Sequence, residues 1–235
     1  MRPIRFHLVV MGAAIGAYAL ITALLAVGQL TAMDRLLADW STTAAPRWLV
    51  YASQYAAYLG QGGPLAALTL AIAGIQAVRH KDDWWKPISL WVAAFVLEAA
   101  VVVPVKMFTR RGAPADHQAD AIDFFSKGFC GTPACESYPS GHAVNAIVWY
   151  GLAILLIGNL VHSAVHATVR FTTVAIVALA TVVSGYHWAT DTLAGVVVGV
   201  GIYAALSLLH ARWGMRDRDL RRTVAQLPCD ASRTV

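Results

Sequence analysis

The sequence predicts an all-α fold, a polytopic membrane helix bundle with about six transmembrane helices. Hydrophobic residues occupy 58% of its 235 positions and charged residues only 13%, whereas soluble domains are about one quarter charged. The mean hydropathy is +0.57. So little polar surface cannot cover a soluble globule, which argues against a soluble enzyme, a disordered chain and a nucleic-acid-binding module. Three cysteines are too few for a disulfide scaffold or a zinc cluster.

Apolar runs near the length of a transmembrane helix, about 20 residues, define the elements. They predict one domain, 1–235, with spans at about 8–33, 65–78, 88–105, 142–161, 169–185 and 191–211. The first run is longer than the ~7–15-residue apolar core of a secretory signal, so we interpret it as an uncleaved span. Residues 48–60 form a shorter apolar stretch, which we expect to lie at the interface or to re-enter the membrane. Pro64 suits the first turn of the next helix.

The positions of lysine and arginine predict the orientation of the bundle, because short cytoplasmic loops carry the excess of positive charge. With the N-terminus inside, 12 of the 18 cations fall on the cytoplasmic side and 6 on the other. The tail 212–235 is strongly basic, and we interpret it as a topology determinant near anionic headgroups. The prediction is a multi-pass cell-membrane protein with both termini cytoplasmic and no nucleic-acid partner.

Three polar clusters lie at the outer ends of the predicted spans. The first, 106–114, opens a polar outer loop over 106–141, and a loop of that length usually has a function or is disordered. The second is Tyr138-Pro-Ser-Gly-His142, and the third covers 184–191. Because the spans alternate in direction, all three clusters are expected at one membrane face.

Two of these clusters carry the groups that bind a phosphate. Fixed positive charge can come from a lysine with one of two arginines, the arginine binding with two hydrogen bonds. A serine and backbone amides at a predicted helix N-terminus form an anion-binding site. The candidate phosphate-binding residues are Lys106, Arg110, Arg111, Ser140 and Gly141.

The candidate catalytic residues are two histidines and an aspartate. An imidazole forms covalent intermediates, so His187 is the candidate nucleophile. Asp191 lies four residues further on, where a helical turn would let its carboxylate hold one ring nitrogen. His142 would protonate the leaving oxygen. Each cluster taken alone also fits a structural role, as interfacial charge, helix cap or paired side chains.

No metal or other cofactor is predicted. The outer loop is acidic, but the spacing of its possible ligands matches no metal-binding template. These residues are Asp116, His117, Asp120, Asp123 and Glu136. We therefore interpret them as solvated side chains.

The three clusters resemble the motifs of the type 2 phosphatidic acid phosphatase superfamily, which read Lys-x6-Arg-Pro, Pro-Ser-Gly-His and Ser-Arg-x5-His-x3-Asp. The resemblance covers roughly 48–211, with the second motif complete. It implies a six-span lipid phosphatase with a lipid phosphate as substrate. It also implies that His187 is the nucleophile, Asp191 its orienting partner and His142 the general acid. Lys106, Ser140 and Gly141 would bind the phosphate.

The chain departs from this pattern at both motif arginines. Ala113 stands before Pro114 where the first motif has arginine, and Ala180 and Thr181 stand where the third motif has Ser-Arg. Arg111 matches a second arginine that is common in such motifs. The phosphate charge is therefore expected to rest on Lys106, Arg111 and Arg110.

Three functions remain open at this point. The first is a metal-independent phosphatase that hydrolyses a lipid phosphate monoester or diphosphate at the outer membrane face through a phospho-histidine. The second is a lipid phosphotransferase, and the third is a catalytically weak relative that binds lipid phosphates. A transporter is disfavoured, because the polar groups gather at one surface and not at mid-bilayer. The partners are the substrate and membrane lipids, and the oligomeric state is left open.

Two further features allow more than one interpretation. Glu98 lies inside a predicted span, where an acid is either a functional group or part of a structural pair. Cys130 and Cys135 are predicted to form a disulfide in the outer loop, with two free thiols as the alternative. Cys229, in the cytoplasmic tail, is expected to be reduced.

Overall fold

The structure, a computed structural model, describes residues 2–116, 120–125, 136–157 and 163–225. Within these ranges the chain is helical and contains no strand, which confirms the predicted fold class. The α-helices are α1 (Arg2–Ala26), α2 (Thr31–Thr43), α3 (Arg47–Ala57), α4 (Gly62–Arg79), α5 (Trp85–Thr109), α6 (Gly141–Ile157), α7 (Ser163–Val183) and α8 (Ala189–Ala225). Three short 3-10 turns are η1 (Tyr58–Gly60), η2 (Lys81–Asp83) and η3 (Pro114–Asp116).

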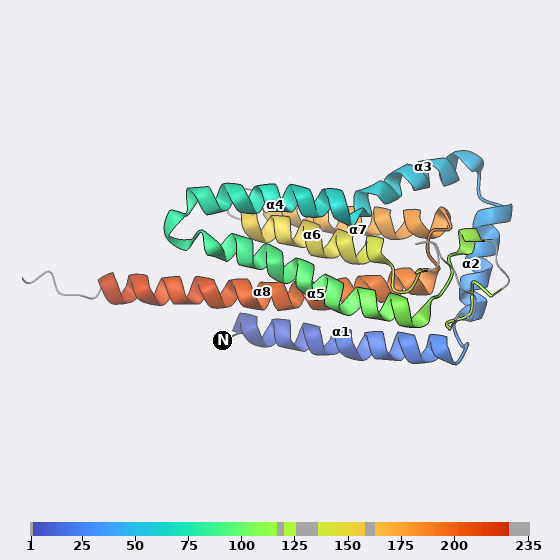
Figure 1. Ribbon diagram of the computed structural model, residues 1–235, viewed down its shortest axis with the longest axis horizontal. Helices are drawn as coiled ribbons and strands as arrows, with labels where there is room; N and C mark the ends of the chain where they lie inside the picture. The colour runs from blue at the N-terminus through green and yellow to red at the C-terminus, as the bar shows by residue number, and fades with distance from the viewer. Residues whose placement is uncertain (1, 117–119, 126–135, 158–162, 226–235) are drawn as a thin grey trace, which may run out of the picture.

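The helices that lie lengthwise in the bundle are α1, α4, α5, α6, α7 and α8 (Figure 1). The short helix α2 crosses one end of the bundle, and α3 extends from α4 at that same end. Among the described residues, four segments are long and apolar enough to cross a membrane: Ile4–Ala26, Arg47–Arg79, Trp85–Asp116 and Ala189–Gly214. Two shorter apolar helices, Gly141–Ile157 and Phe171–Val183, complete the set.

The first helix ends earlier than the sequence predicts. The apolar run continues to residue 33, but α1 stops at Ala26 because the chain turns at Gly28 with φ +77°. The Gln29 N–H donates to the Leu24 carbonyl (2.9 Å) and the Gly28 N–H to the Leu25 carbonyl (2.9 Å), which is the Schellman arrangement of a helix end. The last residues of the predicted span, 31–33, therefore begin a second helix, α2, which lies at a different angle from α1.

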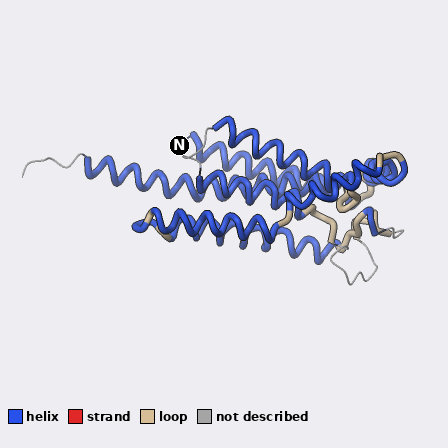
Figure 2. Tube along the Cα trace, turned by 90° about the horizontal axis from the view of Figure 1, so that it is seen from above, coloured by secondary structure: helices blue, strands red, loops and turns tan. Residues whose placement is uncertain are grey.

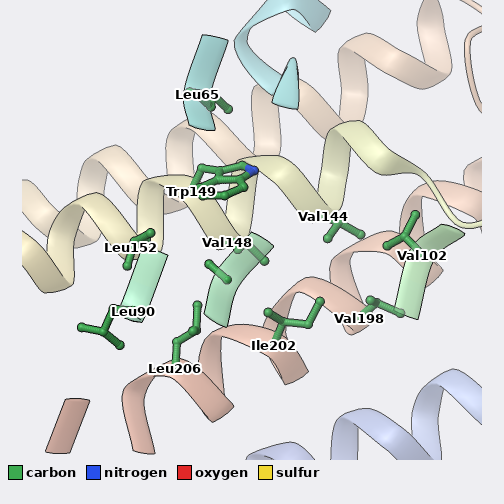
Figure 3. Close-up of a cluster of buried hydrophobic side chains, with 11 residues drawn as sticks. Leu65, Leu90, Val102, Val144, Val148, Trp149, Leu152, Val198, Ile202 and Leu206 are labelled. Atoms are coloured by element: carbon green, nitrogen blue, oxygen red, sulfur yellow. The ribbon is translucent and has the colours of Figure 1, made fainter. Parts of the chain in front are cut away.

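Helix α6 forms the centre of the bundle and packs against α4, α5, α7 and α8. Its buried side chains point in several directions, as expected for a helix that is apolar all round. Figure 3 shows Val144, Val148, Trp149 and Leu152 of α6 facing residues of the helices around it. The position of α6 fixes where its first residues lie relative to the neighbouring helix ends.

Helices α6 and α8 approach each other closely because α8 presents glycines to α6. A Cβ at Gly195 would lie 2.5 Å from the Ser140 carbonyl oxygen, and one at Gly199 would lie 3.0 Å from the Ile147 Cβ. Small residues allow this approach, which increases the van der Waals contact that drives helix association in a membrane. The start of α8 is thus held against the start of α6.

The three polar clusters of the sequence meet at one end of the bundle. The C-terminal end of α5, the N-terminal end of α6 and the turn between α7 and α8 lie beside α2 and α3 (Figure 1). Most of the described loop segments gather at this end, opposite the C-terminal end of α8 (Figure 2). The site is therefore assembled from segments that are far apart in the sequence.

Candidate active site

A cavity of about 600 Å³ opens at this end of the bundle. Its walls come from α3, η1, the start of α4, the end of α5, the η3 turn, the start of α6 and the loop before α8. Four of the predicted site residues line it: Lys106, Gly141, His142 and His187. The structure thus brings both candidate catalytic histidines and one predicted cation into a single cavity.

The two histidines face each other. His187 Nε2 lies 3.2 Å from His142 Nδ1, and the ring centroids are 5.3 Å apart. His187 lies just before α8, after a turn at Gly185 with φ +75°, and its backbone N–H donates to the Thr181 carbonyl (3.1 Å). At this distance the two nitrogens contact each other directly, so a phosphate would have to enter between them for one histidine to attack phosphorus and the other to protonate the leaving oxygen.

Ser137 orients the ring of His187. His187 Nδ1 lies 3.0 Å from the Ser137 carbonyl oxygen, which assigns the ring proton to Nδ1 and leaves the Nε2 lone pair facing the cavity. The Ser137 hydroxyl lies 3.1 Å from the same nitrogen and donates to Asp191 Oδ2 (2.6 Å). Asp191 therefore acts on His187 through Ser137.

The geometry of Asp191 differs from the prediction. The spacing of His187 and Asp191 suggested one helical turn, but α8 begins only at Ala189, so the two residues do not share a helix. The Asp191 carboxylate instead accepts the N–H of Trp188 (3.1 Å), as an acid at the third helical position does in a capping box. Ser137 was missed by the sequence reasoning, and its only signal is its place directly before the Tyr-Pro-Ser-Gly-His motif.

Arg111 is buried and is not among the residues that line the cavity, so its predicted contact with phosphate does not fit the structure. The side chain is fully buried, and its guanidinium donates to Asp34 (2.6 Å), Thr190 Oγ1 (2.8 Å), the Ile122 carbonyl (3.3 Å) and Asp191. It also lies 5.4 Å from the centre of the Trp188 ring. Arginine suits this position because its fork of donors serves several acceptors at once.

Asp34 is a second residue that the sequence reasoning missed. It lies in α2, is buried, and accepts hydrogen bonds from the Thr190 N–H (3.0 Å) and hydroxyl (2.6 Å) as well as from Arg111. Arg111 therefore ties α2 and the first turn of α8 to the end of α5. Nothing in the local sequence marks Asp34, because its partners are far away in the chain.

Arg110 is exposed and does not line the cavity, which also departs from the prediction. It ends α5 in the left-handed conformation with φ 50°, and its Nε lies 3.4 Å from the Met107 carbonyl oxygen. Lys106, one turn earlier, lines the cavity and donates from Nζ to the Glu136 carbonyl. A Cβ on Gly141 would lie 3.9 Å from Lys106 Cε, so the lysine side chain lies close to the first residue of α6.

Ser140 is buried beside the cavity and caps α6. Its hydroxyl accepts from the Ala143 N–H (3.4 Å) and its own N–H donates to the Asp191 carbonyl (2.9 Å). The Ser140 N–H is therefore already hydrogen-bonded within the protein. At this helix N-terminus, Gly141 and His142 are the residues that line the cavity. Lysine charge and a helix N-terminus both favour an anion, so we call the end of the cavity at Lys106 and Gly141 its candidate anion-binding end.

The two departures from the motif pattern lie in different places. Ala113 lines the cavity. Thr181 is buried, its hydroxyl donates to the Ala178 carbonyl (3.1 Å), and its own carbonyl holds the backbone of His187. A larger side chain at position 113 would reach the cavity directly, whereas position 181 contacts the backbone of His187.

The pKa of His187 is held well below its ordinary value of 6.5, first by burial and then by the positive charge of Lys106 and by His142. The hydrogen bond to the Ser137 carbonyl opposes this shift but does not cancel it. His187 is therefore neutral near pH 7, with the lone pair that a nucleophile requires.

Other predicted features lie outside the site or outside the described residues. Glu98 of α5 has one buried oxygen, Oε2, without a hydrogen-bond partner in the described part of the chain. Asp116 and Glu136 line the cavity, whereas Asp123 is exposed elsewhere. The predictions for His117 and for the three cysteines, Cys130, Cys135 and Cys229, fall outside the described residues.

The comparisons with known proteins agree with this architecture. A model of the PAP2 superfamily matches residues 87–215, which include all three motif clusters. The fold is similar to the crystal structure of a transmembrane PAP2-type phosphatidylglycerolphosphate phosphatase from Bacillus subtilis, with a TM-score of 0.68 and 18% identity. That match covers 88% of this chain and 96% of the other. No curated protein sequence matches the chain.

Proposed function

The chain belongs to the PAP2 superfamily as a multi-pass membrane protein, and from this premise we propose that it is a metal-independent lipid phosphate phosphatase working through a phospho-histidine. Membership of the superfamily and the fold of a lipid phosphatase support phosphatase activity in general. The observation that carries the specific proposal is the opposed pair of His187 and His142, 3.2 Å apart in a cavity that also holds Lys106. The proposed substrates are lipid phosphate monoesters or diphosphates.

The first chemical step transfers the phosphoryl group to the enzyme. His187 Nε2 attacks phosphorus, the bond from phosphorus to the lipid oxygen breaks, and His142 gives its proton to that oxygen. Lys106 and the amides at the start of α6 stabilise the negative charge on the phosphoryl oxygens. Ser137 keeps the proton on Nδ1, so that Nε2 remains the attacking atom.

The second step releases phosphate. His142, now neutral and without its acidic proton, accepts a proton from water, and the resulting oxygen attacks the phospho-histidine. The bond between phosphorus and His187 Nε2 breaks, inorganic phosphate leaves, and both histidines return to their starting states. An alcohol in place of water would give phosphotransfer by the same route, and a product assay distinguishes the two outcomes.

We further propose that the cavity opens at the outer face and that both termini are cytoplasmic. The start of α1 and the C-terminal end of α8 lie at the opposite end of the bundle from the helix ends that line the cavity (Figure 1). The basic tail favours the cytoplasm for that end. Near the cavity, α3 exposes Trp48, Tyr51 and Tyr55, residues that prefer the level of lipid headgroups.

The test is phosphate release from a panel of lipid phosphates by purified protein in excess chelator. The wild-type protein should release phosphate without a divalent metal and should incorporate label from a phosphate-labelled substrate. His187→Ala should abolish both signals, whereas Arg110→Ala, an exposed change outside the cavity, should preserve them. Activity that disappears in chelator and returns with magnesium would contradict the mechanism, as would undiminished labelling of His187→Ala.

A further inference from the structure

The described lining of the cavity has an unusual charge for a phosphate-binding site. Among its described lining residues, Lys106 is the one lysine or arginine, and Asp116 and Glu136 are two carboxylates. Both histidine rings belong to the reacting pair. The described lining outside that pair therefore carries more negative than positive charge.

One carboxylate is fixed beside the missing arginine. Asp116 Oδ2 accepts the backbone N–H of Ala113 at 2.7 Å, and both residues line the cavity. Where the superfamily pattern places a cation, this chain presents a methyl group with a carboxylate next to it. Glu136 lies beside Lys106, since its backbone carbonyl accepts a hydrogen bond from Lys106 Nζ, and the residue is exposed.

The remaining polar lining is neutral. Gln54 of α3 and Gln61, between η1 and α4, line the cavity, and each offers an amide donor and a carbonyl acceptor. Both precede residue 87, where the match to the superfamily begins. A cavity of about 600 Å³ is in the range of pockets that enclose a whole small molecule, roughly 300–1,000 Å³. The space beyond the phosphate therefore suits a group that carries hydroxyls.

We propose that this cavity selects lipid phosphate monoesters with hydroxyl groups near the phosphate and discriminates against diphosphates, with Asp116 and Glu136 as specificity-determining residues. The proposal rests on the function proposed above and narrows it. A diphosphate has a second phosphate, and its added negative charge would lie near the carboxylates of Asp116 and Glu136 in the described lining. Two like charges a few ångströms apart at a half-exposed site repel each other strongly enough to matter for binding.

The experiment compares two substrates that differ only in phosphate number, a polyprenyl monophosphate and the diphosphate of the same alcohol. We expect kcat/KM to be at least about tenfold lower for the diphosphate, a difference of about 1.4 kcal/mol. The ratio of kcat/KM for the diphosphate to kcat/KM for the monophosphate should increase in Glu136→Gln and in the double variant Asp116→Asn/Glu136→Gln. Glu136→Lys should increase this ratio most. Asp123→Asn, which removes an exposed charge from the same loop, is the matched control and should leave the ratio unchanged.

The amide residues have their own measurement. Gln61→Leu should raise KM for a monophosphate with a glycerol-type headgroup more than for the bare polyprenyl monophosphate, which offers no hydroxyl. An equal increase for both substrates would contradict a role of Gln61 in binding hydroxyl groups.

The outcomes separate the two proposals. Equal kcat/KM for both phosphates, or a ratio unmoved by Glu136→Lys, would overturn the selectivity while leaving the phosphatase intact. If neither substrate is hydrolysed, the phosphatase proposal fails, and the selectivity is then tested by titrating the protein with inorganic phosphate and with pyrophosphate. Tighter binding of phosphate supports it, and equal or tighter binding of pyrophosphate refutes it.

Discussion

Arg111→Ala is the most informative single substitution, because the sequence and the structure assign the residue different roles. As a phosphate ligand, Arg111 would contribute to turnover, and its loss would cost on the order of 10²–10³ in rate. In the structure its side chain is fully buried and pairs with Asp34 and Asp191, which are also fully buried. Its removal therefore leaves two carboxylates without their cation.

The expected loss of stability in Arg111→Ala follows from the burial of this ion pair. Removing one partner of a buried ion pair typically costs about 3–5 kcal/mol. For a chain of this size, about 2–4 °C of melting temperature corresponds to each kcal/mol, so the expected decrease is roughly 6–20 °C. Activity should fall as well, because Asp191 holds Ser137 and Ser137 orients His187.

The assay is thermal unfolding of detergent-purified variants, measured together with kcat and KM. Arg110→Ala is the matched control, since this neighbouring arginine is exposed and its loss should change stability by no more than about 0.5 kcal/mol. Asp34→Asn combined with Arg111→Met should be more stable than Arg111→Met alone, because one unpaired carboxylate has been neutralised.

A specific result would refute this reasoning. Suppose that Arg111→Ala unfolds at the wild-type temperature but has a higher KM or binds the phosphate analogue vanadate more weakly. The arginine would then contact phosphate, and its role in the buried network with Asp34 and Asp191 would be refuted. The absence of any rescue by Asp34→Asn would likewise remove the argument that Arg111 neutralises that carboxylate.

Three further predictions concern the surroundings of the nucleophile. Ser137→Ala should lower kcat by about tenfold with little change in KM, because the contact of its carbonyl with His187 remains while the hydrogen bond to Asp191 is lost. An unchanged kcat would refute the proposal that the Ser137 hydroxyl positions His187. Gly195→Ala should destabilise the protein by about 1–3 kcal/mol, because its Cβ would overlap the carbonyl oxygen of Ser140, just before α6, whereas Gly12→Ala has nothing within 4 Å and should be neutral or stabilising in the same melting assay. The lowered pKa of His187 means that the unfolded chain binds a proton below about pH 6.5 while the folded protein does not, so stability should be full above that pH and fall below it. The acid limb of kcat/KM that belongs to His187 should accordingly lie below pH 6.5, and His187 titrating at or above 6.5 by NMR would contradict this.

The apolar helices could be predicted from the sequence for a physical reason, whereas the superfamily was indicated by the resemblance of three motifs. In a bilayer every backbone polar group must be satisfied within its own segment, so a long apolar run is a helix whatever its neighbours are. The meeting of the three motif clusters at one end also followed, since helices of similar length alternate in direction. The break at Gly28 was missed because apolarity continues through it, and only the backbone conformation ends α1 there.

The hydrogen-bond partners inside the site could not be predicted in the same way. Arg111 and Asp34 are 77 residues apart, and Ser137 and Asp191 are 54 apart. No local pattern encodes such pairs, because each depends on the angle at which two helix ends meet. A cation beside a phosphate motif looks the same in sequence whether its side chain turns toward substrate or toward buried carboxylates. The packing of α2 and α8 against the end of α5 decides between them, because it places two acids behind Arg111 and leaves Lys106 facing the cavity.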